Sequence, residues 1–390
     1  MDYTTGIYPG AGIARYTRSL VGALAGMDGR NRYGLFYAGR GLPKGTPERG
    51  IAEELFRRHG NFRGVAVPLS VRQTFGLWQR LRAPLPVEIF TGRCDVVHSP
   101  DFVSPPHLWG ADVITVHDLS FLVVPECAEP KLAAFLGRTV PSAVRRADHV
   151  LAVSEQTKSD LIRLLDVPPG KVTVAYNGVE ARFRPFDEAE LKGPGGHSGG
   201  GEWKIEIGCE RFILHVGTLE PRKNLVRLVE AYGRLVSAKR VGDVALVLAG
   251  RKGWVYEPIH KAAERVNGAG GRVIFLDFVR DEHLPLLYNM ATGFAYPSLY
   301  EGFGLPAAEA LACGTPTLVS TDGALREVVG DAAVAVDPRS VEEIADGLER
   351  LLLDEGLRAR LREQGPVQVA RFTWEAAARK VLDVYEKVGA

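Results

Sequence analysis

The feature that most constrains this chain is a repeated alternation of short β-branched runs with helical patterns. The runs of the first half lie at 63–68, 95–99, 112–117, 149–154 and 171–176. Those of the second half lie at 212–217, 243–250, 272–277, 293–298, 315–320 and 332–337. Strands and helices that alternate at this spacing are typical of parallel βαβ units. The chain is therefore predicted to be an α/β protein.

A Gly-rich stretch separates the two sets of runs. It contains KGPGGHSGGGEW, which cannot pack a core and is typical of a flexible connector. A chain of 390 residues is also long for one core. We predict two Rossmann-like domains at 1–184 and 212–372, joined by a linker at 185–211. Ligands of open α/β sheets bind beyond the carboxyl ends of the strands, so both sheets are expected to face a cleft.

The two ends of the chain each carry a specific prediction. At the C-terminal end, Thr373 can cap a helix that starts at Trp374 and carries Val381, Val384 and Tyr385 on one face. At the N-terminal end, only MDYTTGIY precedes a glycine-containing turn, which leaves little room for a first strand. A late start site and a real divergence both explain this short beginning.

Composition and charge narrow the functional classes. The four cysteines are scattered, no apolar run approaches the length of a membrane span, and no signal-peptide pattern is present, which predicts a cytoplasmic protein. Residues 1–184 carry 23 Lys/Arg and 17 Asp/Glu, against 25 and 30 in residues 185–390. Nucleic acid is not an expected partner. The basic first half fits an anionic substrate, peripheral contact with the inner face of the membrane, or an ordinary solvated surface.

The segment EGFGLPAAE follows the run at 293–298 and places two carboxylates, Glu301 and Glu309, around a helix start. Gly302 and Gly304 permit a tight turn, and Pro306 suits the first turn of a helix. Such a helix start can hold a diphosphate. The two carboxylates can each accept hydrogen bonds from hydroxyl groups of one ligand. A solvated Glu301 and a capping Glu309 are the alternative.

Three further places could carry chemistry. Arg222 and Lys223 follow Gly217 at the end of the run at 212–217, where cations can neutralise a leaving phosphate; a surface basic pair is the alternative. His117 ends the run at 112–117, where it can bind a sugar hydroxyl, transfer a proton, or serve structure alone. The turn that contains Gly10 and Gly12 opens a helix and can meet a phosphate or an acceptor, or be a plain turn.

Several fingerprints are missing from the sequence. No Gly-x-Gly-x-x-Gly occurs at either first turn, which disfavours a dinucleotide oxidoreductase. There is also no Walker motif, His/Cys metal cluster or Asp-x-Asp pair, so the sequence does not require a metal.

Taken together, the segments resemble the family 4 retaining glycosyltransferases of the GT-B type. The resemblance rests on GAGIARYTRSLVGAL, TVHDLSFLVVPE, RRADHVLAVSEQTKSDL, VPPGKVTVAYNGV, ILHVGTLEPRKNL, LDFVRDEHLPLLYNMA, YPSLYEGFGLPAAEALACGTP and EVVGDAAVAVDP, in this order. It implies two Rossmann-like domains that face a cleft, with a C-terminal helix at 373–390 that crosses back to the first domain. Within the family the chain is most similar to bacterial GDP-mannose-dependent mannosyltransferases of polysaccharides and O-antigens.

The resemblance also implies the roles of individual residues. Glu301 contacts the hydroxyls of the donor sugar, Glu309 binds the ribose, and Arg222 and Lys223 hold the diphosphate in place of a metal. His117 touches the donor sugar near the reaction centre. The remaining implied contacts are Gly217, Phe303, Gly304 and Leu305 on the sugar or phosphates, Phe278 and Val279 on the base, and Gly10 and Gly12 on the acceptor side.

The implied activity is retaining transfer of a hexose, mannose being favoured, from a nucleotide-diphosphate sugar to a glycan or lipid-linked saccharide. Two alternatives stay open. A GT-B-shaped sugar-nucleotide isomerase of the non-hydrolysing epimerase type would need no acceptor, and an inactive relative would bind the nucleotide sugar without transferring it.

Overall fold

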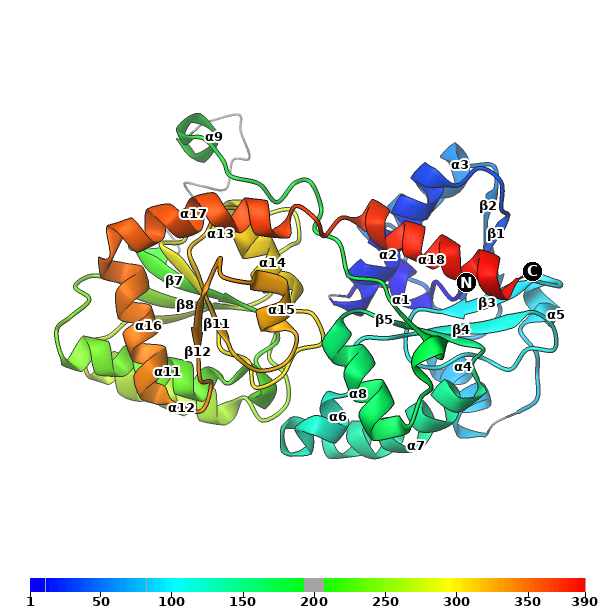
Figure 1. Cartoon of the computed structure of the whole chain (residues 1–390), viewed down its shortest axis with the longest axis horizontal. Coiled ribbons are helices and arrows are strands. Elements are labelled where there is room, and N and C mark those ends of the chain that lie inside the picture. The colour runs from blue at the N-terminus through cyan, green and yellow to red at the C-terminus, as the bar shows by residue number, and fades with distance from the viewer. Residues whose placement is uncertain (11, 82, 193–206, 390) are drawn as a thin grey trace. The chain divides into compact units, whose positions relative to one another are not determined.

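The computed structural model describes residues 1–10, 12–81, 83–192 and 207–389. The chain divides into two compact units (Figure 1). The first comprises Met1–Leu122, Lys131–Gly178 and Phe372–Ala390, and the second comprises Val123–Pro130 and Val179–Arg371. The predicted linker at 185–211 includes residues 193–206, which lie outside the described residues.

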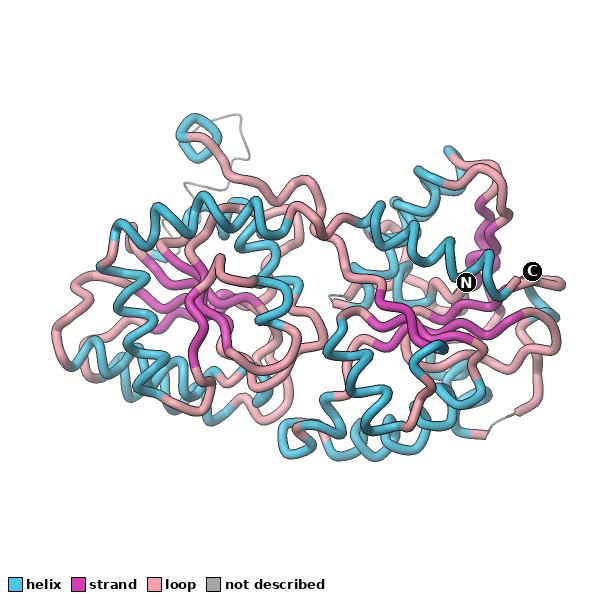
Figure 2. The backbone as a smooth tube through the Cα atoms, viewed as in Figure 1, coloured by secondary structure: helices cyan, strands magenta, loops and turns pink. Residues whose placement is uncertain are grey.

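The second unit contains a six-stranded parallel sheet with helices packed around it (Figure 2). Its strands are β7 (Phe212–Val216), β8 (Ala245–Ala249), β9 (Val273–Leu276), β10 (Gly293–Tyr296), β11 (Thr317–Ser320) and β12 (Val334–Val336). Its helices are α9 (Glu188–Lys192), η4 (Pro221–Lys223), α11 (Leu225–Ser237), α12 (Glu257–Gly268), α13 (Leu284–Met290), α14 (Leu305–Ala312), α15 (Leu325–Val329), α16 (Val341–Leu353) and α17 (Glu355–Val369). Each of the six runs predicted for this half contains one of the strands.

The order of the strands in the second sheet is β12-β11-β10-β7-β8-β9. From β7 the chain continues to β8 on one side, and from β10 it continues to β11 on the other. The sheet therefore reverses its direction of growth between β7 and β10. In doubly wound sheets ligands bind at such a switch point, beyond the carboxyl ends of the strands.

The first unit contains two pieces of parallel sheet that a short N-terminal segment joins. Its strands are β1 (Tyr33–Ala38), β2 (Phe62–Val67), β3 (Val96–Ser99), β4 (Ala111–Val116), β5 (His149–Ala152) and β6 (Val172–Val174). The Asp2 N–H donates to the His98 carbonyl of β3 (2.9 Å), and the Tyr3 N–H donates to the Phe36 carbonyl of β1 (2.8 Å). Residues 1–3 therefore take the central position, which is the expected place of the short first strand.

The sequence analysis missed β1. Its segment, YGLFYA, contains no β-branched residue and one glycine, so it lacks the composition that marked most of the other strands, although β10 (GFAY) shares this lack. The strand forms because Leu35 and Phe36 are buried in the core of the first unit, and this burial cannot be seen in the composition of the segment.

Helices cover the sheet of the first unit as well. They are α1 (Thr4–Ile7), α2 (Ile13–Met27), α3 (Pro47–Arg58), α4 (Val71–Thr74), η1 (Phe75–Arg80), α5 (Glu88–Thr91), α6 (Ser120–Val123), α7 (Pro130–Arg146), α8 (Glu155–Leu165), η3 (Pro169–Lys171) and α18 (Trp374–Val388). A further short helix, η2 (Pro125–Cys127), falls in the second unit. None of the helices in the described parts of the chain is long and apolar enough to cross a bilayer.

Each unit has its own core. In the second unit, Leu246 of β8, Leu228 of α11 and Leu348 of α16 belong to one buried cluster. In the first, Ile114 of β4 and Leu161 of α8 belong to another. Each sheet thus buries apolar side chains against its own helices, as expected of parallel sheets.

The last helix returns to the first unit, as predicted. The Thr373 side chain accepts a hydrogen bond from the Ala376 N–H and so caps α18. Val381 and Val384 are buried where α18 packs on α2. The Tyr385 hydroxyl also lies 2.6 Å from Nδ1 of His98, which ties the helix to β3.

Gly178 packs closely against the backbone at the start of α18. A Cβ atom added at Gly178 would lie 2.2 Å from the Trp374 nitrogen and 2.5 Å from the Thr373 carbonyl carbon. Both are backbone atoms, so they cannot rotate away as a side chain would. Only glycine permits this approach of the two segments.

We predict that Gly178→Ala lowers the free energy of unfolding by about 3 kcal/mol, because the start of α18 must shift. Urea unfolding followed by circular dichroism measures the change. Gly170→Ala is the matched control, since nothing lies within 4 Å of a Cβ atom at Gly170. Equal stability of the two variants would show that Gly178 does not restrict the docking of α18.

Candidate active site

Two loops of the second unit flank the switch point. One leaves β7 at Gly217, passes through η4 and enters α11, and the other leaves β10 and enters α14. Because both strands run parallel in adjacent positions, both loops lie at the same edge of the sheet. The sequence placed Arg222 and Lys223 on the first loop and Glu301 on the second, and the structure brings these three side chains together.

The three side chains form a buried ion cluster with Glu220. Oε1 of Glu301 lies 2.6 Å from Nζ of Lys223, and its Oε2 lies 2.8 Å from the Arg222 guanidinium. The same guanidinium lies 2.9 Å from Oε1 of Glu220. The Lys223 and Glu301 side chains are 9% and 8% exposed. Two cations and two carboxylates thus balance in charge at the mouth of the switch point.

Neighbouring groups fix the cluster further. Nζ of Lys223 also donates to the Tyr296 hydroxyl (2.6 Å), and Arg222 donates to the Tyr300 carbonyl (2.8 Å). Asn224 adopts a left-handed φ of 60° and donates to the carbonyls of Pro297 (3.0 Å) and Pro338 (2.6 Å). Asn224 therefore locks the first loop onto the second.

The sequence analysis assigned no role to Glu220, Tyr296 or Asn224. Asn224 follows the basic pair directly and tolerates left-handed backbone better than most residues, which is a signal that could have marked the loop end. Tyr296 and Glu220 become recognisable only once the fold brings the two loops together.

The cluster controls the charge of its members. Burial would raise the pKa of Glu301, but the charges and hydrogen bonds of Arg222 and Lys223 outweigh burial and lower the pKa to about 2. Burial, with the like charge of Arg222, lowers the pKa of Lys223. Burial also raises the pKa of Tyr296 well above its usual range, so its hydroxyl stays protonated. Glu301 is thus ionised throughout the neutral range.

Helix α14 begins beside the cluster. Gly304 precedes it with a φ of +88°, and a Cβ atom there would lie 2.3 Å from Cδ2 of Leu325. No side chain caps the helix, and Leu305 and Pro306 form its first turn next to the buried Phe303. An uncapped helix start beside two cations is suited to an anion.

Glu309 lies deeper, one turn into α14. Its side chain is buried, and Oε2 accepts a hydrogen bond from the Tyr288 hydroxyl at 3.2 Å. Glu309 thus contacts Tyr288 of α13, whereas Glu301 pairs with Arg222 and Lys223.

An exposed aromatic ring follows β9. Phe278 is 48% exposed, whereas Val279 beside it is buried. The Arg251 guanidinium, at the carboxyl end of β8, lies 4.2 Å from the centre of the Phe278 ring. The sequence analysis did not single out Arg251. Together the two residues offer a flat surface at the same edge of the sheet as the ion cluster.

His117 belongs to the first unit. Its Nε2 lies 2.7 Å from the Pro100 carbonyl, so Nε2 carries the hydrogen and Nδ1 the lone pair. Its ring packs edge-on against Tyr16 (4.7 Å) and Phe102 (5.8 Å). Burial lowers the pKa of His117, which keeps the ring neutral at pH 7.

Tyr16 of helix α2 connects the turn that contains Gly10 and Gly12 to His117. Gly12 precedes α2 with a φ of +54°, and the Tyr16 N–H donates to its carbonyl. The ring of the same Tyr16 contacts His117. The Gly10 carbonyl accepts a hydrogen bond from Arg18 (3.3 Å). The first unit therefore places both of its predicted site elements together.

We predict that Glu301→Gln lowers the free energy of unfolding by about 4 kcal/mol at pH 7, because two buried cations lose their shared partner. The pKa of Glu301 is lowered in the folded protein, so its stabilisation is present above about pH 4.5 and is lost as the pH falls toward 2. Urea unfolding between pH 7 and pH 3 should therefore show the wild-type protein and the variant converging. Glu282→Gln, an exposed carboxylate, is the control. A pH-independent difference would contradict the assigned charge.

Known glycosyltransferase families match both halves of the chain. Residues 203–368 match the model of glycosyl transferases group 1, and residues 10–183 match that of glycosyltransferase family 4. The O-antigen chain mannosyltransferase B of Escherichia coli is 29% identical over 97% of both chains.

Solved structures share the fold. Sucrose-phosphate synthase from Thermosynechococcus elongatus superposes with a TM-score of 0.75 at 20% identity, over 99% of this chain and 97% of that one. Anabaena HepE, crystallised with UDP and glucose, superposes with a TM-score of 0.69 at 18% identity, over 97% of both chains. The chain has the GT-B fold and belongs to the family 4, group 1 glycosyltransferases.

Proposed function

We propose that this glycosyltransferase moves mannose from GDP-mannose to a glycan or lipid-linked saccharide in the synthesis of a cell-envelope polysaccharide, with retention of configuration. The observation that carries the proposal is the buried cluster in which Glu301 holds both Arg222 and Lys223 at the switch point. This is where a doubly wound sheet receives a nucleotide ligand.

The cluster can exchange its partners when a donor binds. The phosphate oxygens compete with Glu301 for Arg222 and Lys223, and the start of α14 adds its positive end. Glu301 is then released to accept hydrogen bonds from hydroxyls of the sugar. One ionised carboxylate thus stabilises the empty site and recognises the sugar in the filled one.

The nucleoside is proposed to bind along the same edge of the sheet. Glu309 accepts hydrogen bonds from the ribose hydroxyls in place of the one that it accepts from Tyr288. The base lies against the backbone at Phe278 and Val279. The exposed Phe278 ring with Arg251 above it supports this placement. Gly217, Gly304 and Leu305 offer backbone close to the phosphates and sugar.

The first unit is proposed to supply the acceptor side. The turn at Gly10 and Gly12 contacts the acceptor, and His117 contacts the donor sugar. Since the Nε2–H of His117 is held by Pro100, the lone pair on Nδ1 is the group that can accept a hydrogen bond from a hydroxyl.

The proposed reaction is a front-face displacement. The bond between the anomeric carbon and the diphosphate oxygen breaks, and the acceptor oxygen bonds to the same face of that carbon. The acceptor proton passes to the departing phosphate oxygen. Arg222 and Lys223 stabilise the negative charge that develops on the diphosphate, a task for which fixed cations in a dry site are effective.

The proposed donor sugar, acceptor and cellular location are based on the similarity to relatives. The E. coli O-antigen chain mannosyltransferase matches this chain along its whole length, which favours mannose and a polysaccharide acceptor. A location in the cytoplasm, at the inner face of the membrane, belongs to the same proposal. The competing isomerase function predicts that a sugar nucleotide alone is converted to its epimer, which nuclear magnetic resonance of the incubated donor detects.

We predict that GDP-mannose raises the melting temperature more than UDP-glucose or ADP-glucose at equal concentration, since a ligand that binds the native state stabilises it. Differential scanning fluorimetry with the three donors measures this. A larger shift with UDP-glucose would overturn the choice of base and sugar without affecting the assignment to the family.

We predict that Lys223→Ala lowers the rate of sugar transfer at least about a hundredfold, because a cation that meets the leaving diphosphate is removed. Release of nucleoside diphosphate in the presence of acceptor measures the rate. Lys261→Ala, an exposed lysine on α12, is the control. Transfer by Lys223→Ala at the rate of the control would remove Lys223 from the proposed chemistry.

A further inference from the structure

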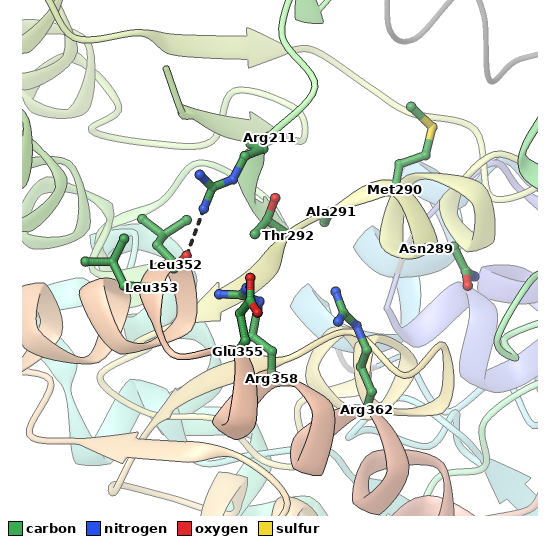
Figure 3. Close-up of a pocket in the computed structure, with 10 residues that line it drawn as sticks. All are labelled: Arg211, Asn289, Met290, Ala291, Thr292, Leu352, Leu353, Glu355, Arg358 and Arg362. Carbon is green, nitrogen blue, oxygen red and sulfur yellow. Dashed lines mark hydrogen bonds and ion pairs between the residues drawn. The ribbon is translucent and has the colours of Figure 1, made fainter. Parts of the chain in front are cut away.

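A hollow lies in the second unit, away from the ion cluster, and Figure 3 shows the residues that line it. Its volume is about 610 Å³, and its polar lining includes Arg211, Asn289, Thr292, Glu355, Arg358 and Arg362. Arg211 precedes β7 and Thr292 precedes β10, so the hollow lies at the amino ends of the two strands that end at the candidate active site. Five residues of β7 at about 3.3 Å each put the two sites about 17 Å apart.

Three guanidinium groups converge on this hollow. Arg358 and Arg362 are one turn apart on α17 and therefore share a face of the helix (Figure 3). Arg211 reaches in from the strand side and donates to the Leu352 carbonyl (2.8 Å). Arg358 donates to the Leu351 carbonyl (3.2 Å). These two contacts cap the end of α16 but use only part of the donor capacity of each guanidinium.

The positive charge of the hollow is poorly neutralised. Among the described residues that line it, the one carboxylate is Glu355, which lies 3.7 Å from Arg358 and is 92% exposed. Within the described parts of the chain, the Arg362 guanidinium makes no hydrogen bond or ion pair with another residue. Although Arg362 is exposed to solvent, partial desolvation and the like charge of Arg358 lower its pKa. Residues 185–390 as a whole carry more Asp/Glu than Lys/Arg, so this cluster contrasts with its surroundings.

We propose that the arginine hollow is a second binding site, for a phosphate-bearing anion with at least two negative charges. Planar guanidinium groups match the oxygens of a phosphate in pairs, and three of them around one concave surface suit a doubly charged group. The phosphate can belong to a free anion or to the headgroup of an anionic lipid. In either case the ligand is separate from the sugar donor, because the hollow contains none of the residues at the donor edge of the sheet.

Isothermal titration with sodium pyrophosphate tests the free anion. We expect Arg362→Gln to weaken the binding at this site about tenfold or more, because charge-assisted hydrogen bonds are lost. Arg360→Gln changes an arginine on the same helix that does not line the hollow, so this variant should bind as the wild-type protein does. Arg222→Gln distinguishes binding at the hollow from binding at the ion cluster, since this variant should weaken only the pyrophosphate bound at the ion cluster.

Sedimentation with vesicles tests the lipid source. Vesicles that contain phosphatidic acid, whose phosphate monoester can carry two negative charges, test this source. Binding of these vesicles to the wild-type protein but not to Arg362→Gln, together with no binding to phosphatidylcholine, would identify a headgroup as the ligand. Binding of pyrophosphate that depends on Arg362, without vesicle binding, would identify a free anion. If Arg362→Gln changes neither measurement, or if all pyrophosphate binding is lost in Arg222→Gln, the proposal is wrong.

Discussion

The site depends on one ionised carboxylate that holds two buried cations. Glu301 contacts Arg222 and Lys223, which lie 79 and 78 residues before it in the chain, and so joins the loops that follow β7 and β10. Buried charges are costly unless they are paired and hydrogen-bonded. The cluster meets this condition with Glu220, Tyr296 and the Tyr300 carbonyl as further partners. The two cations are therefore held at the switch point before any ligand arrives, and positioned cations are what electrostatic stabilisation of a leaving group requires.

The two units build the centre of their parallel sheets in different ways. The second builds its sheet from six strands of its own, and its switch point lies between two of them. The first places residues 1–3 at the centre, where the Asp2 and Tyr3 N–H groups hydrogen-bond to strands on either side. Helix α18 then adds packing on α2 and a hydrogen bond from Tyr385 to His98.

Much of the architecture, and three residues that the structure brings together in the candidate site, could be predicted for identifiable reasons. The predicted runs overlap every strand except β1, and most of them are rich in β-branched residues, which β1 (YGLFYA) and β10 (GFAY) both lack. Arg222, Lys223 and Glu301 were found because each follows a strand at its carboxyl end. Glu220 and Tyr296 were not, because their importance comes from contacts between loops far apart in sequence. The burial of Glu309 against Tyr288 likewise appears only when α13 and α14 are packed together.

The position of α18 has a consequence for folding during synthesis. The second unit is made almost entirely of one continuous stretch, Val179–Arg371, and this stretch leaves the ribosome before residues 374–388 do. Domains usually fold in the order in which they are made. Here the face of α2 that α18 covers stays exposed until α18 emerges. The first unit, whose synthesis begins first, is therefore completed last. A nascent chain of this protein therefore carries an uncovered apolar surface throughout its elongation.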